Sequence, residues 1–348
     1  MFSQTEPPAG DLKTMTPFRI VAIGGGTGLS TLLNGLKHYA RDPREVEITA
    51  IVTVTDDGGS SGRLRRDFDV LPPGDIRNCM VALSEDEALL SKLFQYRFRG
   101  GRGLKGHSFG NLFLTALTNL TGDFAQAVKV SSEVLASLGR IYPATTSNVV
   151  LEAELEDGSV VQGETRIGKS RSRINRLRLK PRHCRPLPET LAAIEEADLI
   201  TLGPGSLFTS VIPNLLVDGI ASAVQNSRAL KAYFVNLMWQ PGETIGFRAS
   251  DHVEAIHRHA GRPFIDVAVV NTRPISPRQR RKYAAQKARP VLNDVDRLAE
   301  MGLQVVAADL LASGSIVRHD PRASADVALQ LAKRGQTARR RMSVLTRA

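Results

Sequence analysis

A glycine-rich turn joins a predicted buried strand to a predicted helix near the start of the chain. The stretch reads FRIVAIGGGTGLSTLLNGL and holds Gly24, Gly25, Gly26, Thr27 and Gly28. Glycines let a backbone approach an anion closely, and the first turn of a helix offers unpaired N–H groups at the positive end of its dipole. Leu29 replaces the third glycine of a dinucleotide fingerprint, and the lysine of a P-loop is absent. We therefore predict a phosphate-binding turn of another kind, with a purely structural turn as the alternative.

A second loop rich in acids, glycines and serines follows the next predicted strand. Its sequence, TVTDDGGSSGRLRRDF, places Asp56 beside Asp57. Carboxylates at the end of a strand suit the hydroxyls of a ribose, or a magnesium ion held on a phosphate. We predict a nucleotide-binding loop in which Asp56 and Asp57 are the candidate magnesium ligands. The neighbouring donors and cations are Gly58, Gly59, Ser60, Arg63, Arg65 and Arg66.

Two short motifs place polar side chains at predicted helix starts. In LPPGDIRN, Asp75 can either cap a helix or contact a ligand, and Asn78 follows it. In GHSFGN, His107 and Ser108 stand between glycines, and Asn111 ends the motif. A histidine with a hydroxyl and an amide at a helix N-terminus can contact an anion, whereas a lone histidine is more often structural. His107 is also the candidate general base of the chain.

Loops after two later strands repeat the chemistry of the first turn. LGPGSLFTSVIPNL is again rich in glycines and hydroxyls, and NLMWQPGET adds two amides that could read a base or a sugar. The candidate binding residues here are Gly203, Gly205, Ser206, Thr209, Asn236 and Gln240. Open α/β sheets bind ligands outside the carboxyl ends of their strands, so we expect all these loops to share one site.

Several common catalytic and metal-binding patterns do not occur in the sequence. In SDHVEAIHRHAG, the histidines His252, His257 and His259 lack the i, i+4 spacing of a helical zinc pair, so an ordinary helix is predicted. No Ser–His–Asp elbow and no Cys–His pair stands out. The two cysteines, Cys79 and Cys184, are far apart and fit free thiols in a reducing cytoplasm.

The elements expected to position these loops alternate between apolar strands and amphipathic helices. Runs such as AIVTV, DVAVV and QVVAA are apolar on both faces, as in a sheet covered by helices on both sides. This order predicts a doubly wound, mostly parallel, Rossmann-like α/β sheet. The predicted strands are 19–23, 47–54, 198–203, 231–237, 264–271 and 303–308, and the predicted helices are 29–39, 110–120, 124–138, 188–196, 214–225, 250–259 and 293–301.

One stretch departs from this alternation. NVVLEAELEDGSVVQGETRI has period-two character on both sides of Asp157-Gly158, which predicts a hairpin. RINRLRLKPR continues it, with leucines on one face and basic residues on the other. We therefore divide the chain into a disordered extension at 1–17, a Rossmann-like nucleotide-binding half at 18–141, a small antiparallel β insertion with a basic face at 142–185, the second half of the α/β core at 186–332 and a basic tail at 333–348.

Composition points to a folded cytoplasmic protein. The 348 residues are 42% hydrophobic, and no apolar run approaches the ~18 residues that a membrane helix needs, so no membrane span is expected. The first residues lack the basic and apolar regions of a secretion signal. The net charge of +11 is concentrated at 166–185 and 333–348, and the rest of the chain is slightly acidic. Nucleic acid is therefore not an expected partner, because its binders carry a basic face on the body of the fold.

The motifs together resemble a known family. IGGGTGLSTLL, TVTDDGGSSGRLR, LPPGDIRNC, FQYRF, GHSFGN, LGPGSLFTSVIPNLL, NLM-QPGET and DHVEAIHRHAG closely resemble the YvcK, or gluconeogenesis factor, family. That family belongs to the CofD-like superfamily, named for 2-phospho-L-lactate transferase. The resemblance covers about 18–331 in the same order. The chain departs from the family at Phe109, where leucine is common, and at Trp239, where threonine is common.

The resemblance implies a function as well as a fold. It implies a doubly wound core with a small extra domain, a homodimer, and binding of UDP-N-acetylglucosamine or UDP-glucose. It also implies a cytoplasmic role in cell shape and peptidoglycan supply during gluconeogenic growth. By motif, the pocket would be lined by 24–28, Asp56, Asp57, Asn78, His107, Asn111, 203–206 and Thr209.

Three functions follow as hypotheses. The first is a UDP-sugar-binding regulatory protein with no catalytic residue. The second is a magnesium-dependent transferase that moves a 2-phospholactyl-type group from a nucleotide donor to a deazaflavin or another acceptor alcohol. The third is an NAD-dependent oxidoreductase, and Leu29 in place of a fingerprint glycine argues against it.

Overall fold

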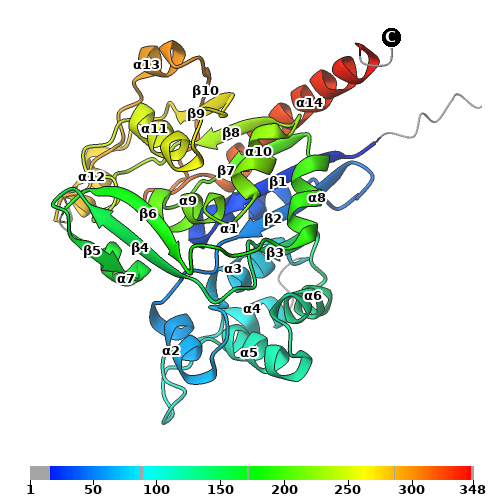
Figure 1. Ribbon diagram of the computed structural model, residues 1–348, viewed down its shortest axis with the longest axis vertical. Coiled ribbons are helices and arrows are strands. Elements are labelled where there is room, and N and C mark those ends of the chain that lie inside the picture. The colour runs from blue at the N-terminus through cyan, green and yellow to red at the C-terminus, as the bar shows by residue number, and fades with distance from the viewer. Residues whose placement is uncertain (1–15, 86–88, 171, 286, 346–348) are drawn as a thin grey trace, which may run out of the picture.

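A seven-stranded parallel sheet forms the centre of the molecule (Figure 1). The computed structural model describes residues 16–85, 89–170, 172–285 and 287–345. The strands run in the order β10-β9-β8-β7-β1-β2-β3. Their bounds are β1 Phe18–Gly24, β2 Val46–Val52, β3 Arg140–Pro143, β7 Leu199–Leu202, β8 Leu230–Phe234, β9 Val267–Asn271 and β10 Gln304–Ala308. The α/β fold class and the six strands predicted from apolar runs are confirmed.

The edge strand β3 differs from the expectation. Tyr142 was predicted to open the β insertion, but it pairs with Ile51 of β2 in the main sheet. β3 has four residues, and Arg140 on it is exposed, so it lacks the continuous apolar run that marks a buried strand. The small sheet begins later, at Val150.

The strand order reverses at the centre of the sheet. The chain leaves β1 for β2 and β3 on one side, then crosses back to place β7 on the other side of β1. Such a reversal opens a crevice outside the carboxyl ends of the two strands that flank it, because their connections run in opposite directions. The loops after β1 and β7 are the glycine-rich segments singled out in the sequence.

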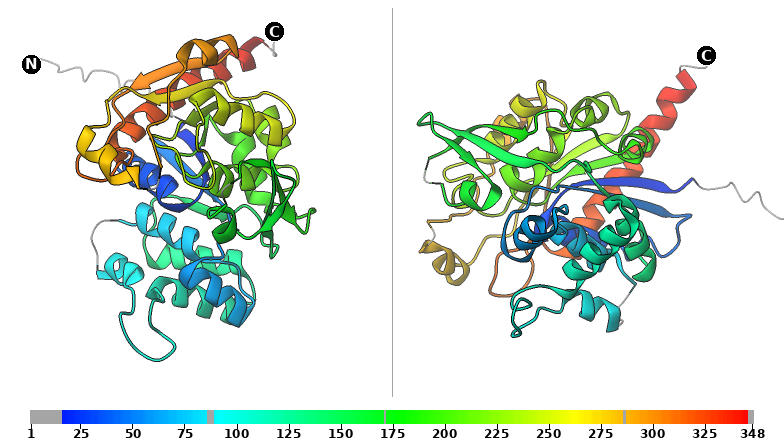
Figure 2. Two further views of the ribbon diagram at one scale, coloured as in Figure 1. Left: turned by 90° about the vertical axis from the view of Figure 1, so that its left-hand side faces the viewer. Right: turned by 60° about the horizontal axis from the view of Figure 1, so that its bottom comes forward.

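Helices cover both faces of the sheet. On one face α1 packs against α3 and α14, and on the other α8 packs against α10. The remaining larger helices include α2, α4, α5 and α6, which gather below the sheet (Figure 2, left). The bounds are α1 Gly26–Leu36, α2 Gly59–Phe68, α3 Gly74–Leu83, α4 Leu89–Gln95, α5 Phe109–Thr121, α6 Phe124–Val134, α8 Pro188–Glu196, α10 Ile220–Asn226, α11 Ala249–Ala260, α12 Pro277–Ala284, α13 Val295–Glu300 and α14 Pro321–Leu345.

One predicted helix is divided in the structure, and most of the segment predicted as a tail is helical. The predicted helix 214–225 is divided between the end of a short α9 at Ile212–Leu215 and most of α10, and a π-helical turn η1 at Leu207–Val211 precedes α9. The first part ends at Leu215, and Gly219, with φ of 80°, stands directly before α10, so the two parts do not form one continuous helix. The segment predicted as a basic tail instead continues α14 as far as Leu345, and this helix projects from the body in Figures 1 and 2.

The small sheet is antiparallel, in the order β5-β4-β6. Its strands are β4 Val150–Leu155, β5 Val160–Gln162 and β6 Ile174–Lys180, and a short α7, Glu164–Ile167, follows β5. The predicted hairpin turns at Gly158 with φ of 80°. Leu177 and Leu179 are buried, while Arg176 and Arg178 lie opposite Glu154 and Glu152, so acids share the basic face.

No single helix among the residues described has the length and apolar character to cross a membrane. A bent pair, Leu207–Leu215 with Ile220–Asn226, passes that test by length and composition alone.

Candidate functional site

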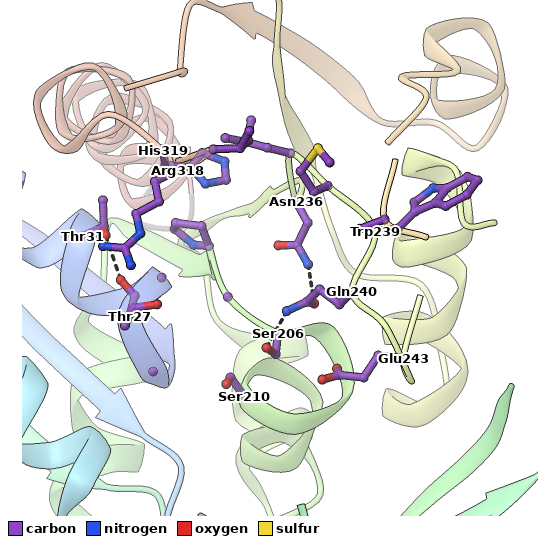
Figure 3. A pocket seen from close by; sticks show the side chains of 18 of the residues that line it. Thr27, Thr31, Ser206, Ser210, Asn236, Trp239, Gln240, Glu243, Arg318 and His319 are labelled. Atoms are coloured by element: carbon purple, nitrogen blue, oxygen red, sulfur yellow. Dashed lines mark hydrogen bonds between the residues drawn. The ribbon is translucent and has the colours of Figure 1, made fainter. Parts of the chain in front are cut away.

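A cavity of about 410 Å³, called here the first cavity, lies at the carboxyl ends of β1, β7 and β8 (Figure 3). It therefore occupies the crevice where the strand order reverses. Its lining includes eight of the residues predicted from sequence: Gly25, Gly26, Thr27, Gly28, Gly205, Ser206, Asn236 and Gln240. The structure thus brings together three loops that are far apart in the chain.

The turn after β1 presents backbone amides to this cavity. Gly25 is extended, α1 begins at Gly26 with φ of 62°, and the N-cap residue Gly25 has no side chain that could cap the helix. The N–H groups of Thr27 and Gly28 lie in the first turn, so they have no acceptor within the helix. They are therefore available to an anion in the cavity, where the helix dipole also favours negative charge.

Glycine is required in this turn for close packing. A Cβ on Gly28 would lie 2.4 Å from the carbonyl oxygen of Pro204, and one on Gly25 would lie 2.7 Å from Oδ2 of Asp75. The first turn of α1 therefore touches both the loop after β7 and the start of α3. The carboxyl of Asp75 accepts the N–H of Gly26, and burial with the nearby Asp56 raises the pKa of Asp75 to about 7.

The loop after β7 is closed by side chains from the loop after β8. The N–H of Phe208 donates to Oε2 of Glu243 at 3.0 Å, and the hydroxyl of Thr209 donates to Oε1 at 3.1 Å. The N–H of Leu207 donates to Oε1 of Gln240 at 3.3 Å. Thr209 was predicted to bind a phosphate, but it does not line the first cavity, and its hydroxyl is hydrogen-bonded to Glu243 instead.

Three predicted residues form a hydrogen-bonded chain along the cavity wall. The amide of Asn236 donates to Oε1 of Gln240 at 3.0 Å, and the amide of Gln240 donates to Oγ of Ser206 at 2.6 Å. This chain fixes the orientation of both amides. Trp239, next to Gln240, turns its indole away and donates to the carbonyl of Phe247 at 2.8 Å (Figure 3).

Glu243 is a cavity residue that the sequence analysis missed. Its side chain is buried, and burial raises its pKa to about 7 against the opposing effect of its hydrogen bonds to Phe208 and Thr209. A carboxyl that titrates near neutrality can exchange a proton with a bound hydroxyl group. The only signal in the sequence was its position in the same loop as Gln240.

A larger cavity of about 970 Å³, the second cavity, adjoins the first. The two share Thr27, Thr31, Arg318 and His319, so they meet at the first turn of α1. Asn78, predicted as a site residue, lines the second cavity. Arg318 and His319 follow the last strand and were not predicted, although the short run Ser313-Gly314-Ser315 stands directly upstream of them.

The other predicted residues line neither cavity. These are Gly24, Asp56, Asp57, Gly58, Gly59, Ser60, His107, Ser108, Asn111, Gly203 and Thr209. His107 contacts Oγ of Ser60 at 3.0 Å, and Ser108 caps α5 by accepting the N–H of Asn111 at 3.2 Å. Burial lowers the pKa of His107. Ser60, in α2, and His107, just before α5, therefore connect these two helices outside the cavities.

The carboxylates of the two candidate magnesium ligands, Asp56 and Asp57, accept hydrogen bonds from other residues of the protein. Oδ1 of Asp57 accepts the N–H and the hydroxyl of Thr165 at 2.8 and 2.6 Å, and Oδ1 of Asp56 accepts the N–H of Gly58 at 2.8 Å. Within the described ranges, no group of three or more His, Cys, Asp or Glu side chains is arranged to hold a metal. A magnesium ion here would need ligands from nucleotide phosphates and water, which Mg²⁺ commonly uses.

Comparison with known proteins places this site in a family. The profile of a family described as 2-phospho-L-lactate transferase CofD matches residues 20–311. The chain belongs to the CofD family. The matched range takes in both glycine-rich loops, β1 to β10, and the loop that carries Glu243.

Within the CofD family, the chain is similar to proteins named gluconeogenesis factor. It is 50% identical over 316 residues to the one from Bacillus subtilis, covering 90% of this chain and 98% of the relative. It is 42% identical over 321 residues to the one from Listeria monocytogenes, covering 92% and 97%. A crystal structure of a Bacillus halodurans protein superposes with a TM-score of 0.86 at 48% identity, covering 89% and 99%.

Proposed function

We propose that this protein is a cytoplasmic, UDP-sugar-binding regulator that links carbon metabolism to cell-wall synthesis and cell shape during gluconeogenic growth. The observation that carries the proposal is the first turn of α1, whose unpaired amides lie where the two cavities meet. The names of the relatives support the metabolic part. The expected assembly is a homodimer.

A nucleoside diphosphate sugar suits the shape and chemistry of the site. The amides of Thr27 and Gly28 and the cationic Arg318 would hold the diphosphate at the junction. The ordered amides of Asn236 and Gln240 would read the polar edge of a base or a sugar. Each part of the ligand then meets donors whose orientation is already fixed, which reduces the entropy lost on binding.

Calorimetric titration of the full chain tests this function. UDP-N-acetylglucosamine and UDP-glucose are compared with NAD and GTP, with and without magnesium. We expect saturable binding of a UDP-sugar and a raised melting temperature, because a ligand that binds only the folded state stabilises it. Equal or tighter binding of NAD would contradict the proposal.

A transferase is the second candidate, and Glu243 is the observation that favours it. Its carboxyl lines the first cavity with a pKa of about 7, a suitable value for a general base acting on an acceptor alcohol. The family profile is also that of a transferase. Against this, the carboxylate already accepts two hydrogen bonds from η1.

Chromatography of the nucleotide after long incubation separates the two candidates. The samples contain UDP-N-acetylglucosamine, magnesium and excess protein, and one also contains a deazaflavin acceptor. A regulator leaves the nucleotide intact. Release of UMP or UDP, or a phosphorylated deazaflavin, beyond a few turnovers per protein would favour the transferase.

A further inference from the structure

The second cavity has a charge pattern that a nucleotide sugar in the first cavity does not use. Its lining includes Lys37, Arg77, Lys92, Arg97 and Arg318, and no aspartate or glutamate among the residues described. Arg318 is shared with the first cavity, whereas the other cations line the second cavity only. The positive charge therefore extends well beyond the site assigned to the diphosphate.

Four of the five cations of this cavity have no ion-pair partner within the part of the chain that the structure describes. Among the residues described, Arg77, Lys92, Arg97 and Arg318 form no ion pair with a carboxylate. Most arginines on protein surfaces can find such a partner or extend into solvent. A cluster of unpaired cations on one concave surface instead raises the local concentration of anions.

Arg77 is held in this cluster at a cost. It donates to the neutral oxygens of Ser108 at 2.9 Å and Asn78 at 2.5 Å, and its buried Nε has no partner. Burial and then the charge of Arg97 lower the pKa of Arg77, while the more distant acids Asp75 and Asp56 partly offset this effect. A buried donor without an acceptor is unfavourable, so the position of Arg77 beside Arg97 costs free energy.

The remaining lining identifies the kind of anion. Small hydroxyl and amide side chains alternate with the cations around the cavity: Ser30, Thr31, Asn34, Asn78, Ser91 and Gln95. Cations recognise a phosphate group, and neutral hydroxyls and amides recognise the hydroxyl groups of a sugar. The volume of about 970 Å³ lies at the upper end of small-molecule sites.

We propose that the second cavity binds a phosphorylated sugar as a separate ligand, beside the nucleotide sugar. This inference rests on the proposed function, since it assigns the first cavity to the UDP-sugar. The two ligands would meet at Thr27, Thr31, Arg318 and His319, which line both cavities. The protein would then compare the level of a cell-wall precursor with that of a sugar phosphate.

Titration with glucose 6-phosphate tests the second site. The full chain is titrated alone and after saturation with UDP-N-acetylglucosamine, with glucose and inorganic phosphate as partial probes. We expect glucose 6-phosphate to bind in both cases and glucose not to bind. Competition between the two ligands at one site would overturn the proposal, as would an absence of glucose 6-phosphate binding at millimolar concentration.

Matched variants locate the binding. Lys92 and Arg97 are exposed cations of the second cavity, and Arg102 is an exposed cation that lines neither cavity. The double variant Lys92→Gln/Arg97→Gln should weaken glucose 6-phosphate binding by about tenfold or more, and Arg102→Gln by less than about twofold. Equal losses in the two proteins would show that binding is a general charge effect and would contradict the assignment.

The same titrations keep the two proposals distinguishable. The double variant should bind UDP-N-acetylglucosamine within about twofold of the wild type, because neither Lys92 nor Arg97 lines the first cavity. Loss of UDP-sugar binding in that variant would place both ligands in one site and overturn the separate second site. If wild-type protein binds glucose 6-phosphate but no UDP-sugar, the proposed function is wrong. The assignment of a phosphorylated sugar to the second cavity then still holds.

Discussion

The carboxylate of Glu243 accepts the backbone N–H of Phe208 at 3.0 Å. This bond joins the loop after β8 to the loop after β7, two segments that the sequence presents as independent binding loops. A backbone donor of the loop that was expected to bind phosphate therefore faces a protein carboxyl. In the proposed function, the amides of Thr27 and Gly28 therefore hold the anion in the first cavity.

The first prediction concerns stability and pH at Glu243. Its pKa is about 7 in the folded chain against 4.5 ordinarily, so the folded state binds more protons than the unfolded state between these values. Stability contributed by this group should therefore fall as pH rises from about 4.5 to 7. In Glu243→Gln the fall in melting temperature between pH 5 and pH 8 should be smaller than in wild type.

A matched control uses an exposed acid. Glu254 is paired with Arg297 on the surface, so Glu254→Gln should keep the wild-type pH dependence. Asp75 and Glu164 also have raised pKa values, about 7 and about 9, so a slope should persist in Glu243→Gln. An identical slope in Glu243→Gln and wild type would contradict the assignment.

The second prediction concerns the contact between the turn after β1 and the loop after β7. In Gly28→Ala, the new methyl group would lie 2.4 Å from the carbonyl oxygen of Pro204, so the two backbones must separate. We expect a loss of about 1–3 kcal/mol in the free energy of unfolding, the usual cost of overpacking, together with weaker UDP-sugar binding. Gly100→Ala, which meets nothing within 4 Å, is the control for denaturation and titration.

The third prediction concerns the attachment of the small sheet. Asp57 accepts the N–H and the hydroxyl of Thr165, and so ties the loop after β2 to α7. Asp57→Ala should speed hydrogen exchange at the amide of Thr165, because that amide loses its acceptor. Asp157→Ala removes an exposed acid from the hairpin turn of the same sheet, and exchange at Thr165 should then be unchanged. Equal hydrogen-exchange protection of the Thr165 amide in the two variants would show that its hydrogen bond to Asp57 does not stabilise this contact.

The fourth prediction concerns Arg318 at the junction of the cavities. Replacing it with glutamine removes the cation that faces Thr27 and Thr31 (Figure 3). We expect UDP-N-acetylglucosamine to bind about tenfold or more weakly to Arg318→Gln, since hydrogen bonds to charged groups contribute about 1.5–3 kcal/mol. Arg322→Gln, a nearby change outside both cavities, should bind as wild type does. Unchanged affinity in Arg318→Gln would place the diphosphate elsewhere.

Local pattern was enough to predict the sheet and much of the first cavity. Strands such as β1 and β2 contain short apolar runs, and Gly25 to Gly28 stand directly between a strand and a helix. These features depend on neighbours in the chain, so a single sequence reveals them. The short edge strand β3 and the charged helix α12 lack such a pattern and were missed.

Pairing between distant loops could not be predicted in the same way. Nothing in the sequence around Thr209 shows that its hydroxyl is bound to Glu243, and nothing around Asp57 shows that Thr165 faces it. Arg318 comes from the far end of the core, where a lone arginine looks like any surface charge. Such contacts follow from the packing of complete elements, which a local pattern does not encode.

The central position of β1 has a consequence for how the chain is made. Its residue Ile20 pairs with Ile48 on one side and with Leu199 on the other. During synthesis, one edge of this apolar strand therefore stays without its native neighbour until more than half of the chain has left the ribosome. Unpaired edges and non-local contacts are both slow to resolve and prone to association between chains. A nascent chain that stops before β7 should accordingly depend on chaperones, and the first cavity can form only once the second half of the chain is present.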